Sequence, residues 1–316
     1  MNTRTLGSTG IVVTELCFGA SPIGSLPGPV GHDAEDDRGV ATVEAVLSSP
    51  IRFIDTSNGY GTDGQSEQRI GIALARTGGL PSDVVIATKV DPATGGTDFS
   101  GDRVRRSFEE SLERLGLDRV PLLHLHDPER ITFEEGVAPG GPLRALVDLK
   151  ERGLVDAIGV AGGPVGLLRR YLDTGEFDVV LSHNRLTLLD RSAEPLFRTA
   201  RERGIGVLNA APYGGGILSR GVAAVPRYAY GLGAAEAVEA ARAMEAVCAR
   251  YDVPLGAAAL QFSLRSDLVD STVVGMSDPT RIAATEALAA TPIPDPLWDE
   301  LASLLPAPAS WLDAGE

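Results

Sequence analysis

Cysteines, aromatic residues and long apolar runs are all scarce in this chain. Two cysteines, Cys17 and Cys248, occur in 316 residues, and neither belongs to a CxxC motif or a Cys/His pair. This spacing predicts neither a disulfide framework nor a zinc site, and it suits a reducing cytoplasm. No run of about 18 apolar residues occurs, and the N-terminus MNTRTLGSTG has no apolar signal-peptide region. The sequence therefore predicts a cytoplasmic protein with no membrane span.

Positive charge is also in short supply. The chain has 28 Lys and Arg against 43 Asp and Glu, which gives a formal net charge of −15 and a pI near 4.7. This balance argues against binding to nucleic acid or to an anionic membrane surface. We expect a small-molecule substrate and a monomer or a small homo-oligomer.

Short apolar runs alternate with helix-like stretches along the whole chain. No Pro/Ser-rich linker divides it, so one domain over residues 1–316 is predicted. Such alternation is typical of βαβ units, which build a parallel sheet covered by helices. The predicted strands are 15–20, 53–57, 84–90, 120–127, 155–163, 179–184, 206–212 and 271–276, and the helix-like stretches include 37–49, 66–76, 102–116, 141–153 and 192–204.

An open doubly wound sheet and a closed barrel both satisfy this pattern. Eight units in about 300 residues favour the closed α/β form, a (β/α)8 TIM barrel. The opening residues add an N-terminal β-hairpin, because Ser8, Thr9 and Gly10 supply turn chemistry between two short β-prone runs.

Polar residues collect at the ends of the predicted strands, where a barrel of this kind places its active site. They are Asp55 with Tyr60 in the loop that follows, Lys89, His124 and His126, and His183 with Asn184. Each residue taken singly could be a local hydrogen-bond partner. Together they supply an acid, a phenol, an amine and an imidazole at the same end of consecutive strands.

These groups suit proton transfer to or from an oxygen attached to carbon. A tyrosine with an ordinary pKa near 10 needs a nearby ammonium to work near neutral pH, and Lys89 could supply it while Asp55 holds the ammonium. An imidazole could orient the carbonyl or hydroxyl oxygen. The sequence offers no GxSxG motif and no metal cluster, so hydride exchange with a nicotinamide cofactor is the chemistry that fits.

The motifs FIDTSNGYG, SEQRIGIAL, IATKV, LLHLHDP, GLVDAIGV and VVGMSDPTRIAAT resemble the aldo-keto reductase superfamily in order and spacing over nearly the whole chain. The resemblance implies a (β/α)8 barrel, a nicotinamide cofactor and a catalytic tetrad. On this chain the tetrad is Asp55, Tyr60, Lys89 and His126, with Tyr60 as the general acid or base. His124 lies deeper on the same strand face, and we interpret it as a packing residue.

Several segments depart from the family pattern where the cofactor binds. Ala161 and Gly162 stand where many members have Ser-Asn, so the contact with the nicotinamide amide must either weaken or come from elsewhere. Cofactor-binding candidates therefore follow three strands: Ser182, His183 and Asn184; Asn209, Ala211, Pro212, Tyr213, Gly214 and Gly216; and Gly275, Ser277 and Arg281. A flexible glycine loop is the alternative interpretation of the second group.

The last of these segments bears on the choice of cofactor. Gly275, Met276 and Ser277 occupy the place of the first basic residue of phosphate-selective members, whereas Arg281 is kept. The cofactor is predicted to be NAD or NADP, with NAD or dual use favoured.

The segments FGASPIGSL, SHNRLTLLDRSAEPL and NAAPYGGGILSRG are similar to those of sugar dehydrogenases that oxidise free aldoses at C1, of the L-fucose, D-threo-aldose and L-galactose type. Oxidation of an aldose to its lactone is the predicted activity. The alternatives are an NADPH-dependent aldehyde or ketone reductase, a related pyridoxal 4-dehydrogenase and a regulatory subunit without turnover. The loops at 22–33, 90–101, 128–142 and 224–231 are expected at the mouth of the pocket.

Overall fold

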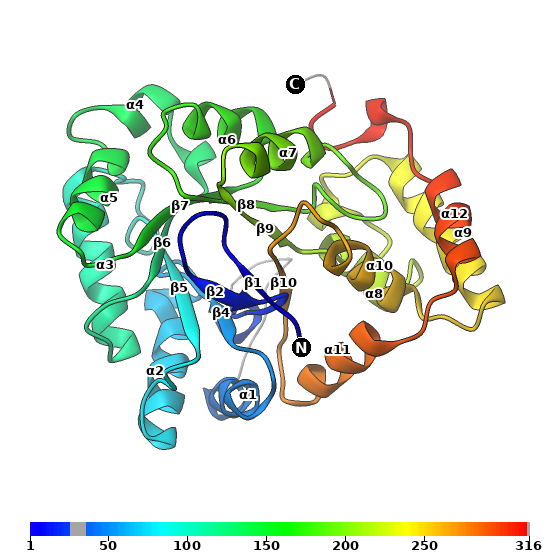
Figure 1. Cartoon of the computed structure of the whole chain (residues 1–316), viewed down its shortest axis with the longest axis horizontal. Coiled ribbons are helices and arrows are strands. Elements are labelled where there is room, and N and C mark those ends of the chain that lie inside the picture. Colours follow the sequence, from blue (N-terminus) through cyan, green and yellow to red (C-terminus); the bar gives the residue numbers. More distant parts are fainter. Residues whose placement is uncertain (26–35, 315–316) are drawn as a thin grey trace.

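The computed structural model describes residues 1–25 and 36–314, in which eight parallel strands close into a barrel surrounded by helices (Figure 1). The strand order around the barrel is β10, β3, β4, β5, β6, β7, β8 and β9, so sequence neighbours pair throughout. Their bounds are β3 (Leu16–Gly19), β4 (Phe53–Asp55), β5 (Val85–Val90), β6 (Leu122–His126), β7 (Ala157–Gly162), β8 (Val179–His183), β9 (Gly206–Ala210) and β10 (Ser271–Gly275). The predicted (β/α)8 fold is confirmed.

Local residues define both ends of the helix that follows β5. Before α3 (Gly101–Leu115), the Ser100 hydroxyl accepts a hydrogen bond from the backbone N–H of Arg103, and Gly116 ends the helix in the left-handed conformation at φ 67°. The other α-helices are α1 (Asp36–Ser48), α2 (Gln65–Thr77), α4 (Phe133–Val137), α5 (Pro142–Glu151), α6 (Val165–Leu172), α7 (Glu194–Glu202), α8 (Ile217–Arg220), α9 (Ala235–Arg250), α10 (Leu255–Leu264), α11 (Thr280–Ala290) and α12 (Asp295–Ser303).

The predicted N-terminal hairpin closes one end of the barrel. Its strands β1 (Thr3–Thr5) and β2 (Val12–Thr14) pair antiparallel. The apolar side chains of Leu6, Ile11 and Val13 are buried in one cluster with residues that fill the barrel interior. The N–H of Ser8 donates to the carbonyl of Gly204, just before β9 begins, at 2.7 Å. The hairpin therefore covers the amino ends of the strands and leaves their carboxyl ends for the site.

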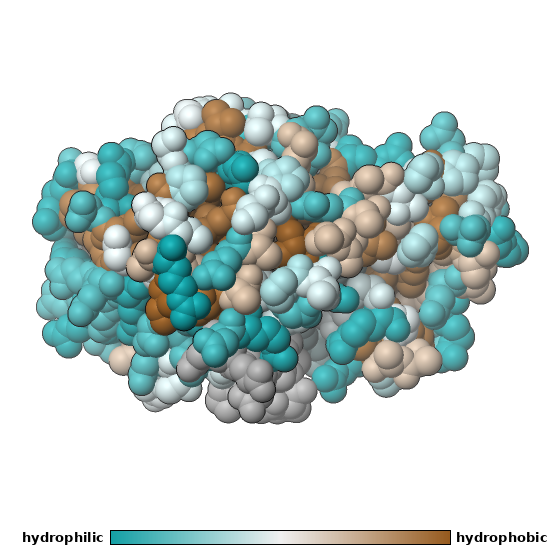
Figure 2. Space-filling view, turned by 90° about the horizontal axis from the view of Figure 1, so that it is seen from below, coloured by the Kyte–Doolittle hydropathy of each residue, from teal (hydrophilic) through white to brown (hydrophobic). Residues whose placement is uncertain are grey.

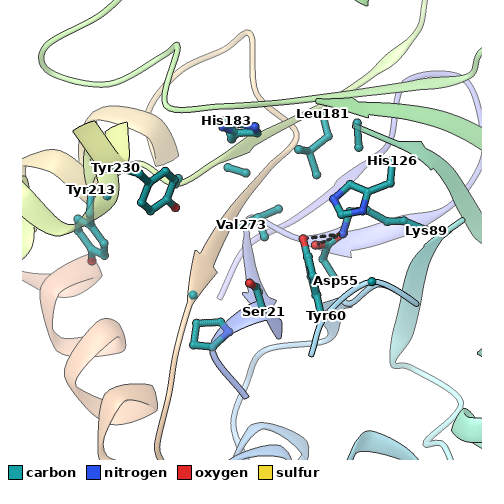
Figure 3. A pocket seen from close by; sticks show the side chains of 18 of the residues that line it. Ser21, Asp55, Tyr60, Lys89, His126, Leu181, His183, Tyr213, Tyr230 and Val273 are labelled. Atoms are coloured by element: carbon teal, nitrogen blue, oxygen red, sulfur yellow. Dashed lines mark hydrogen bonds and ion pairs between the residues drawn. The ribbon is translucent and has the colours of Figure 1, made fainter. Parts of the chain in front are cut away.

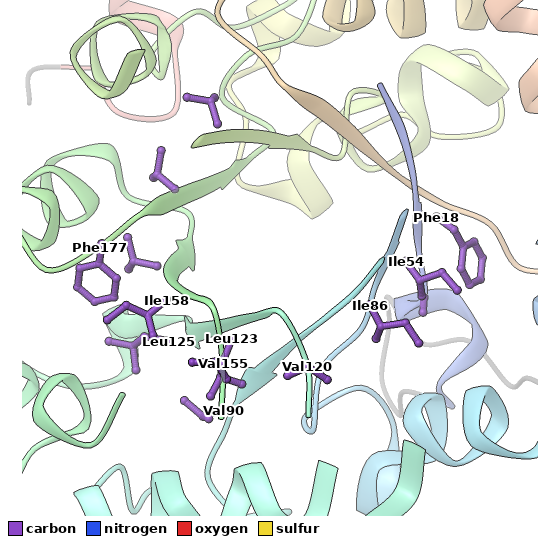
Figure 4. Close-up of a cluster of buried hydrophobic side chains, with 14 of the residues drawn as sticks. Phe18, Ile54, Ile86, Val90, Val120, Leu123, Leu125, Val155, Ile158 and Phe177 are labelled. Carbon is purple, nitrogen blue, oxygen red and sulfur yellow. The ribbon is translucent and has the colours of Figure 1, made fainter. Parts of the chain in front are cut away.

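Alternation along each strand divides the core into two layers. On β6, Leu123 and Leu125 face outward into the apolar layer between strands and helices, shown in Figure 4. Leu122, from the same strand, belongs to the barrel interior. Because successive side chains point to opposite faces, His124 and His126 share the interior face with Leu122. The strand pattern thus brings polar side chains into the barrel at its carboxyl end.

The described part of the chain matches most of the predicted elements to within a few residues. The helix-like stretches named from the sequence end at residue 204; α8 to α12 lie beyond them, and α4 and α6 lie between them. Of the expected mouth segment 22–33, residues 26–33 lie outside the described residues.

No helix in residues 1–25 and 36–314 is long and apolar enough to cross a membrane. Figure 2 shows one face of the molecule, on which hydrophilic side chains are interspersed with hydrophobic patches.

Candidate active site

A cavity of about 710 Å³ opens at the carboxyl ends of the barrel strands. Asp55 ends β4, Lys89 lies near the end of β5, and His126 ends β6. Tyr60 lies in the loop after β4, and all four side chains line the cavity (Figure 3). The parallel arrangement produces this convergence, because every strand delivers its last residues to the same edge.

Lys89 is the centre of a buried hydrogen-bond array. Its Nζ donates to Asp55 Oδ2 at 2.6 Å, to the carbonyl oxygen of Thr56 at 2.7 Å and to the Tyr60 hydroxyl at 3.1 Å. The side chains of Lys89 and Asp55 are only 1% and 3% exposed. Three acceptors match the three N–H bonds of the ammonium, so its orientation is fully determined.

The charges of this array set the resting protonation state. Burial disfavours a charged Lys89, but the nearby Asp55 and Tyr60 outweigh it and raise the pKa of the ammonium. Burial also raises the pKa of Tyr60, against the opposing effect of Lys89. At neutral pH the free protein therefore has a charged Lys89 beside a neutral phenol.

Two glycines place the Tyr60 ring. Gly61 adopts φ 87°, a left-handed conformation that side chains disfavour. A Cβ added to Gly59 would lie 2.7 Å from the carboxyl carbon of Asp91, and the Gly59 N–H donates to Asp91 Oδ2 at 2.9 Å. The sequence Gly-Tyr-Gly thus lets the loop turn sharply while it packs directly on an acidic residue.

His126 is held on its Nδ1 side by Asp91 and Ser57. Nδ1 lies 2.9 and 3.0 Å from the two carboxylate oxygens of Asp91 and 3.1 Å from the Ser57 hydroxyl. Its ring meets the ring of Tyr60 edge to face, with centroids 5.5 Å apart. Burial disfavours a charged imidazole, but Asp127 and Asp91 together raise the pKa of His126.

The predicted cofactor contacts divide into two groups by position. His183, Ala211, Tyr213, Gly216, Gly275, Ser277 and Arg281 line the cavity. Ser182 and Asn209 point away from it, with the Ser182 hydroxyl bonded to the Gly163 carbonyl and the Asn209 amide bonded to Leu186 and Ser263. Asn184, Pro212 and Gly214 are buried outside the cavity wall, and the Asn184 amide lies 3.0 Å from His183 Nδ1.

His183 presents a neutral ring to the cavity. Burial lowers its pKa to about 4, although the charge of Asp127 acts in the opposite direction. Because the Asn184 amide can donate to Nδ1, the ring carries its proton on Nε2. This nitrogen can donate a hydrogen bond to a bound oxygen.

Sequence reasoning did not identify Asp91, Ser57 or Arg130. Asp91 lies two residues after Lys89 on the same strand face, and strand register pairs Lys89 with His124, so Asp91 is level with His126. Arg130 reaches the cavity from the loop after β6 and lies 3.5 Å from Asp91 Oδ1. The alternation of side-chain directions along a strand could have identified Asp91, because it places residues 89 and 91 on the same face.

His124 is fully buried beneath the cavity, as its interpretation as a packing residue requires. Neither ring nitrogen has a hydrogen-bond partner among the described residues. Burial lowers the pKa of His124, so the ring is neutral. It lies against Gly159 of β7, where an added Cβ would come within 2.1 Å of Nδ1.

The Aldo/keto reductase family model matches residues 15–306. The chain belongs to the Aldo/keto reductase family. Among curated relatives it is 37% identical to L-galactose dehydrogenase of Arabidopsis thaliana, over 88% of this chain and 85% of the relative. It is 33% identical to D-threo-aldose 1-dehydrogenase of a Pseudomonas species, over 95% of this chain and 97% of the relative. It is 31% identical to pyridoxal 4-dehydrogenase of Microbacterium luteolum, over 95% of this chain and 96% of the relative.

A solved structure agrees with this assignment. The aldo-keto reductase AKR11C1 from Bacillus halodurans, in its holo form, superposes with a TM-score of 0.77 at 25% identity and covers 97% of both chains. The family and its dehydrogenase members show that this protein is an oxidoreductase acting on CH–OH or C=O groups.

Members of this family use NAD(P)H, and the cavity has groups suited to such a ligand. The Tyr213 hydroxyl is buried in the cavity wall without a hydrogen-bond partner among the described residues. Burial raises the pKa of Tyr213 to about 12, against the effect of Arg281, so it remains a neutral donor. Arg220 and Arg281 also line the cavity and can bind phosphate oxygens.

Proposed function

We propose that this protein is an NAD(P)-dependent dehydrogenase that oxidises a free aldose at C1 to the lactone. The observation that carries the proposal is the contact of the Tyr60 hydroxyl with the buried ammonium of Lys89 inside a cavity that His126 also lines. This arrangement suits exchange of a proton with an oxygen on the carbon that gives or accepts hydride.

Each tetrad residue has a separate part in this proposal. Tyr60 exchanges the proton with the substrate oxygen, as a base in oxidation and as an acid in reduction. Lys89 stabilises the phenolate that forms in the first case, and Asp55 holds the ammonium in place. His126 donates a hydrogen bond to the same oxygen. The bound nicotinamide supplies the hydride chemistry.

Polar groups around the cavity suit a hydroxylated substrate. Asp127 and Arg130 line it near His126, and His183 presents its Nε2–H from β8. These side chains offer both acceptors and donors, which is what adjacent sugar hydroxyls require. The relatives that act on L-galactose and D-threo-aldoses give independent support for this substrate class.

The cavity supports use of both cofactors, with NAD favoured. Arg220 and Arg281 could bind a 2′-phosphate. Asp278 also lines the cavity, and its carboxylate accepts a hydrogen bond from the N–H of Thr280 at the start of α11. Hydrogen bonds from the Thr280 hydroxyl and, to a smaller extent, from the Thr280 N–H lower the pKa of Asp278, so the residue is anionic and opposes a phosphate.

A panel of free aldoses, pyridoxal and simple aldehydes, assayed with NAD, NADP and their reduced forms, tests the proposal. We expect sugar-dependent reduction of NAD or NADP, with formation of a lactone detected by its reaction with hydroxylamine. Oxidation of pyridoxal alone would instead support the activity of the 31% identical relative. Reduction of simple aldehydes without any sugar oxidation would contradict the aldose proposal.

A further inference from the structure

Asp91 is a buried acid in the cavity wall that the proposed function does not use. Its side chain is only 2% exposed, and it makes several polar contacts. Oδ2 accepts from the Gly59 N–H at 2.9 Å and from the Ser57 hydroxyl, and both oxygens lie within 3.0 Å of His126 Nδ1. A carboxylate this deeply buried requires charged or strongly polar partners; His126 and Arg130 both line the cavity, and His126 is the closer of the two.

The contacts fix which atoms carry protons. Burial alone would raise the pKa of Asp91, but the charge of His126 and hydrogen bonds from His126, Ser57 and Gly59 lower it below its usual range. An ionised carboxylate only accepts hydrogen bonds, so His126 Nδ1 must be protonated. The other ring nitrogen, Nε2, can then donate only when the imidazole is positively charged.

We propose that Asp91 is a positioning residue that holds His126 by Nδ1 and keeps it doubly protonated, so that Nε2–H donates to the substrate oxygen from a cation. Asp91 does not itself touch the substrate. The cation stabilises negative charge that develops on the substrate oxygen, and it adds to Lys89 in favouring the phenolate of Tyr60. This inference rests on the proposed function, because it concerns the same reacting oxygen.

Other groups also act on this ring. Asp127 is the second carboxylate close to it, with Oδ1 at 3.6 Å from Nε2, whereas the charge of Lys89 opposes protonation. Asp127 therefore shares the electrostatic effect but does not contact Nδ1. The charged or titratable groups that surround the ring are Asp91, Asp127, Glu129, Arg130, Lys89, Tyr60, His124 and His183.

The substitution Asp91→Asn tests the proposal because an amide cannot satisfy all these partners in the same way. If its oxygen keeps the place of Oδ2, it still accepts from the Gly59 N–H and the Ser57 hydroxyl, and the NH₂ group takes the place of Oδ1, 2.9 Å from His126 Nδ1. The neutral ring then carries its proton on Nε2 instead of Nδ1. The pKa of His126 also falls, because an anion next to it is removed.

The primary measurement is ¹⁵N NMR of the histidine rings in the cofactor-free protein. The chain has four histidines, and His126→Gln identifies the signals of His126. We expect the neutral ring to be protonated on Nδ1 in the wild type and on Nε2 in Asp91→Asn. The control Asp127→Asn removes an equal charge and should lower the pKa without changing the tautomer. A neutral wild-type His126 ring that carries its proton on Nε2 would overturn the proposal, even if Asp91→Asn did not fold.

Kinetics supply a second readout. The rate of the wild-type enzyme should fall as pH rises through the raised pKa of His126, because the positive charge is lost. In Asp91→Asn this fall in rate should occur at lower pH. At a pH between the two transitions, kcat/KM of the variant should be roughly tenfold below that of the wild type, since a neutral donor replaces a charged one. A purely structural role for Asp91 would lower the rate equally at every pH.

The two proposals fail in different ways. If no sugar is oxidised but the tautomers change as expected, the aldose function is wrong and the role of Asp91 stands for another oxygen substrate. If sugar is oxidised, but Asp91→Asn changes neither the tautomer of His126 nor the pH at which the rate falls, only the role of Asp91 is wrong.

Discussion

The substitution Lys89→Met tests the energetic importance of the buried ammonium. Methionine approximates the length of the lysine stem but offers no charge and no hydrogen-bond donor. Asp55 would then remain as a carboxylate with a side chain 3% exposed, and its Oδ1 already lacks a partner among the described residues. Removing one member of a buried ion pair costs about 3–5 kcal/mol, because the other charge is left uncompensated.

This loss of unfolding free energy can be converted to a decrease in melting temperature. For domains of this size 1 kcal/mol corresponds to a shift of about 2 °C, so Lys89→Met should melt roughly 6–10 °C below the wild type. The double variant Asp55→Asn with Lys89→Met removes both charges, and it should regain a large part of the lost stability.

Thermal and urea unfolding followed by circular dichroism measure both effects. A double-mutant cycle with the single Asp55→Asn variant isolates the coupling between the two side chains. The reasoning is refuted if Lys89→Met melts within about 2 °C of the wild type, or if the double variant is no more stable than Lys89→Met alone.

Three other substitutions test separate parts of the structure. Gly159→Ala adds a Cβ that would lie 2.1 Å from the buried His124 ring, so urea unfolding should show a loss of about 1–3 kcal/mol; an unchanged midpoint would contradict the packing. Hydrogen bonds from Arg103 lower the pKa of Glu110 to about 2. The stability that Glu110 adds is therefore present above about pH 4.5 and lost as pH falls toward 2, and Glu110→Gln should flatten this acid dependence in urea titrations at pH 3 and 7. Arg281→Ala should weaken binding of NADP roughly tenfold more than binding of NAD in fluorescence titrations, whereas equal effects would argue against a 2′-phosphate contact.

The sequence predicted the barrel because continuous apolar runs alternate with helical stretches, a pattern set by local composition. It also placed Asp55, Lys89 and His126 at one end of the barrel, since parallel strands deliver their last residues to the same edge. Strand alternation, if followed residue by residue, would also have separated His183, which faces the cavity, from Ser182, which faces away.

Other features depend on information that the local sequence lacks. The pairing of Asp91 with His126 follows from the register of β5 on β6, which periodicity alone does not define. The approach of Arg130 and Tyr230 to the cavity depends on loop conformations, and Tyr230 has a left-handed backbone at φ 63° that its sequence does not announce. The sequence thus placed the loops 128–142 and 224–231 at the mouth of the pocket, where Arg130 and Tyr230 line the cavity, but it did not define which of their side chains turn into the site.

Tyr60→Phe tests the central claim most directly, with the best substrate from the panel and with NAD or NADP. The ring is kept, and only the hydroxyl that contacts Lys89 Nζ at 3.1 Å is lost. We expect kcat to fall roughly 10²–10⁴-fold while the dissociation constant of the cofactor, measured by fluorescence titration, changes less than about twofold. A Tyr60→Phe enzyme that retains more than about half of the wild-type kcat, in a regime where hydride transfer limits the rate, would contradict the proposed role of this tyrosine.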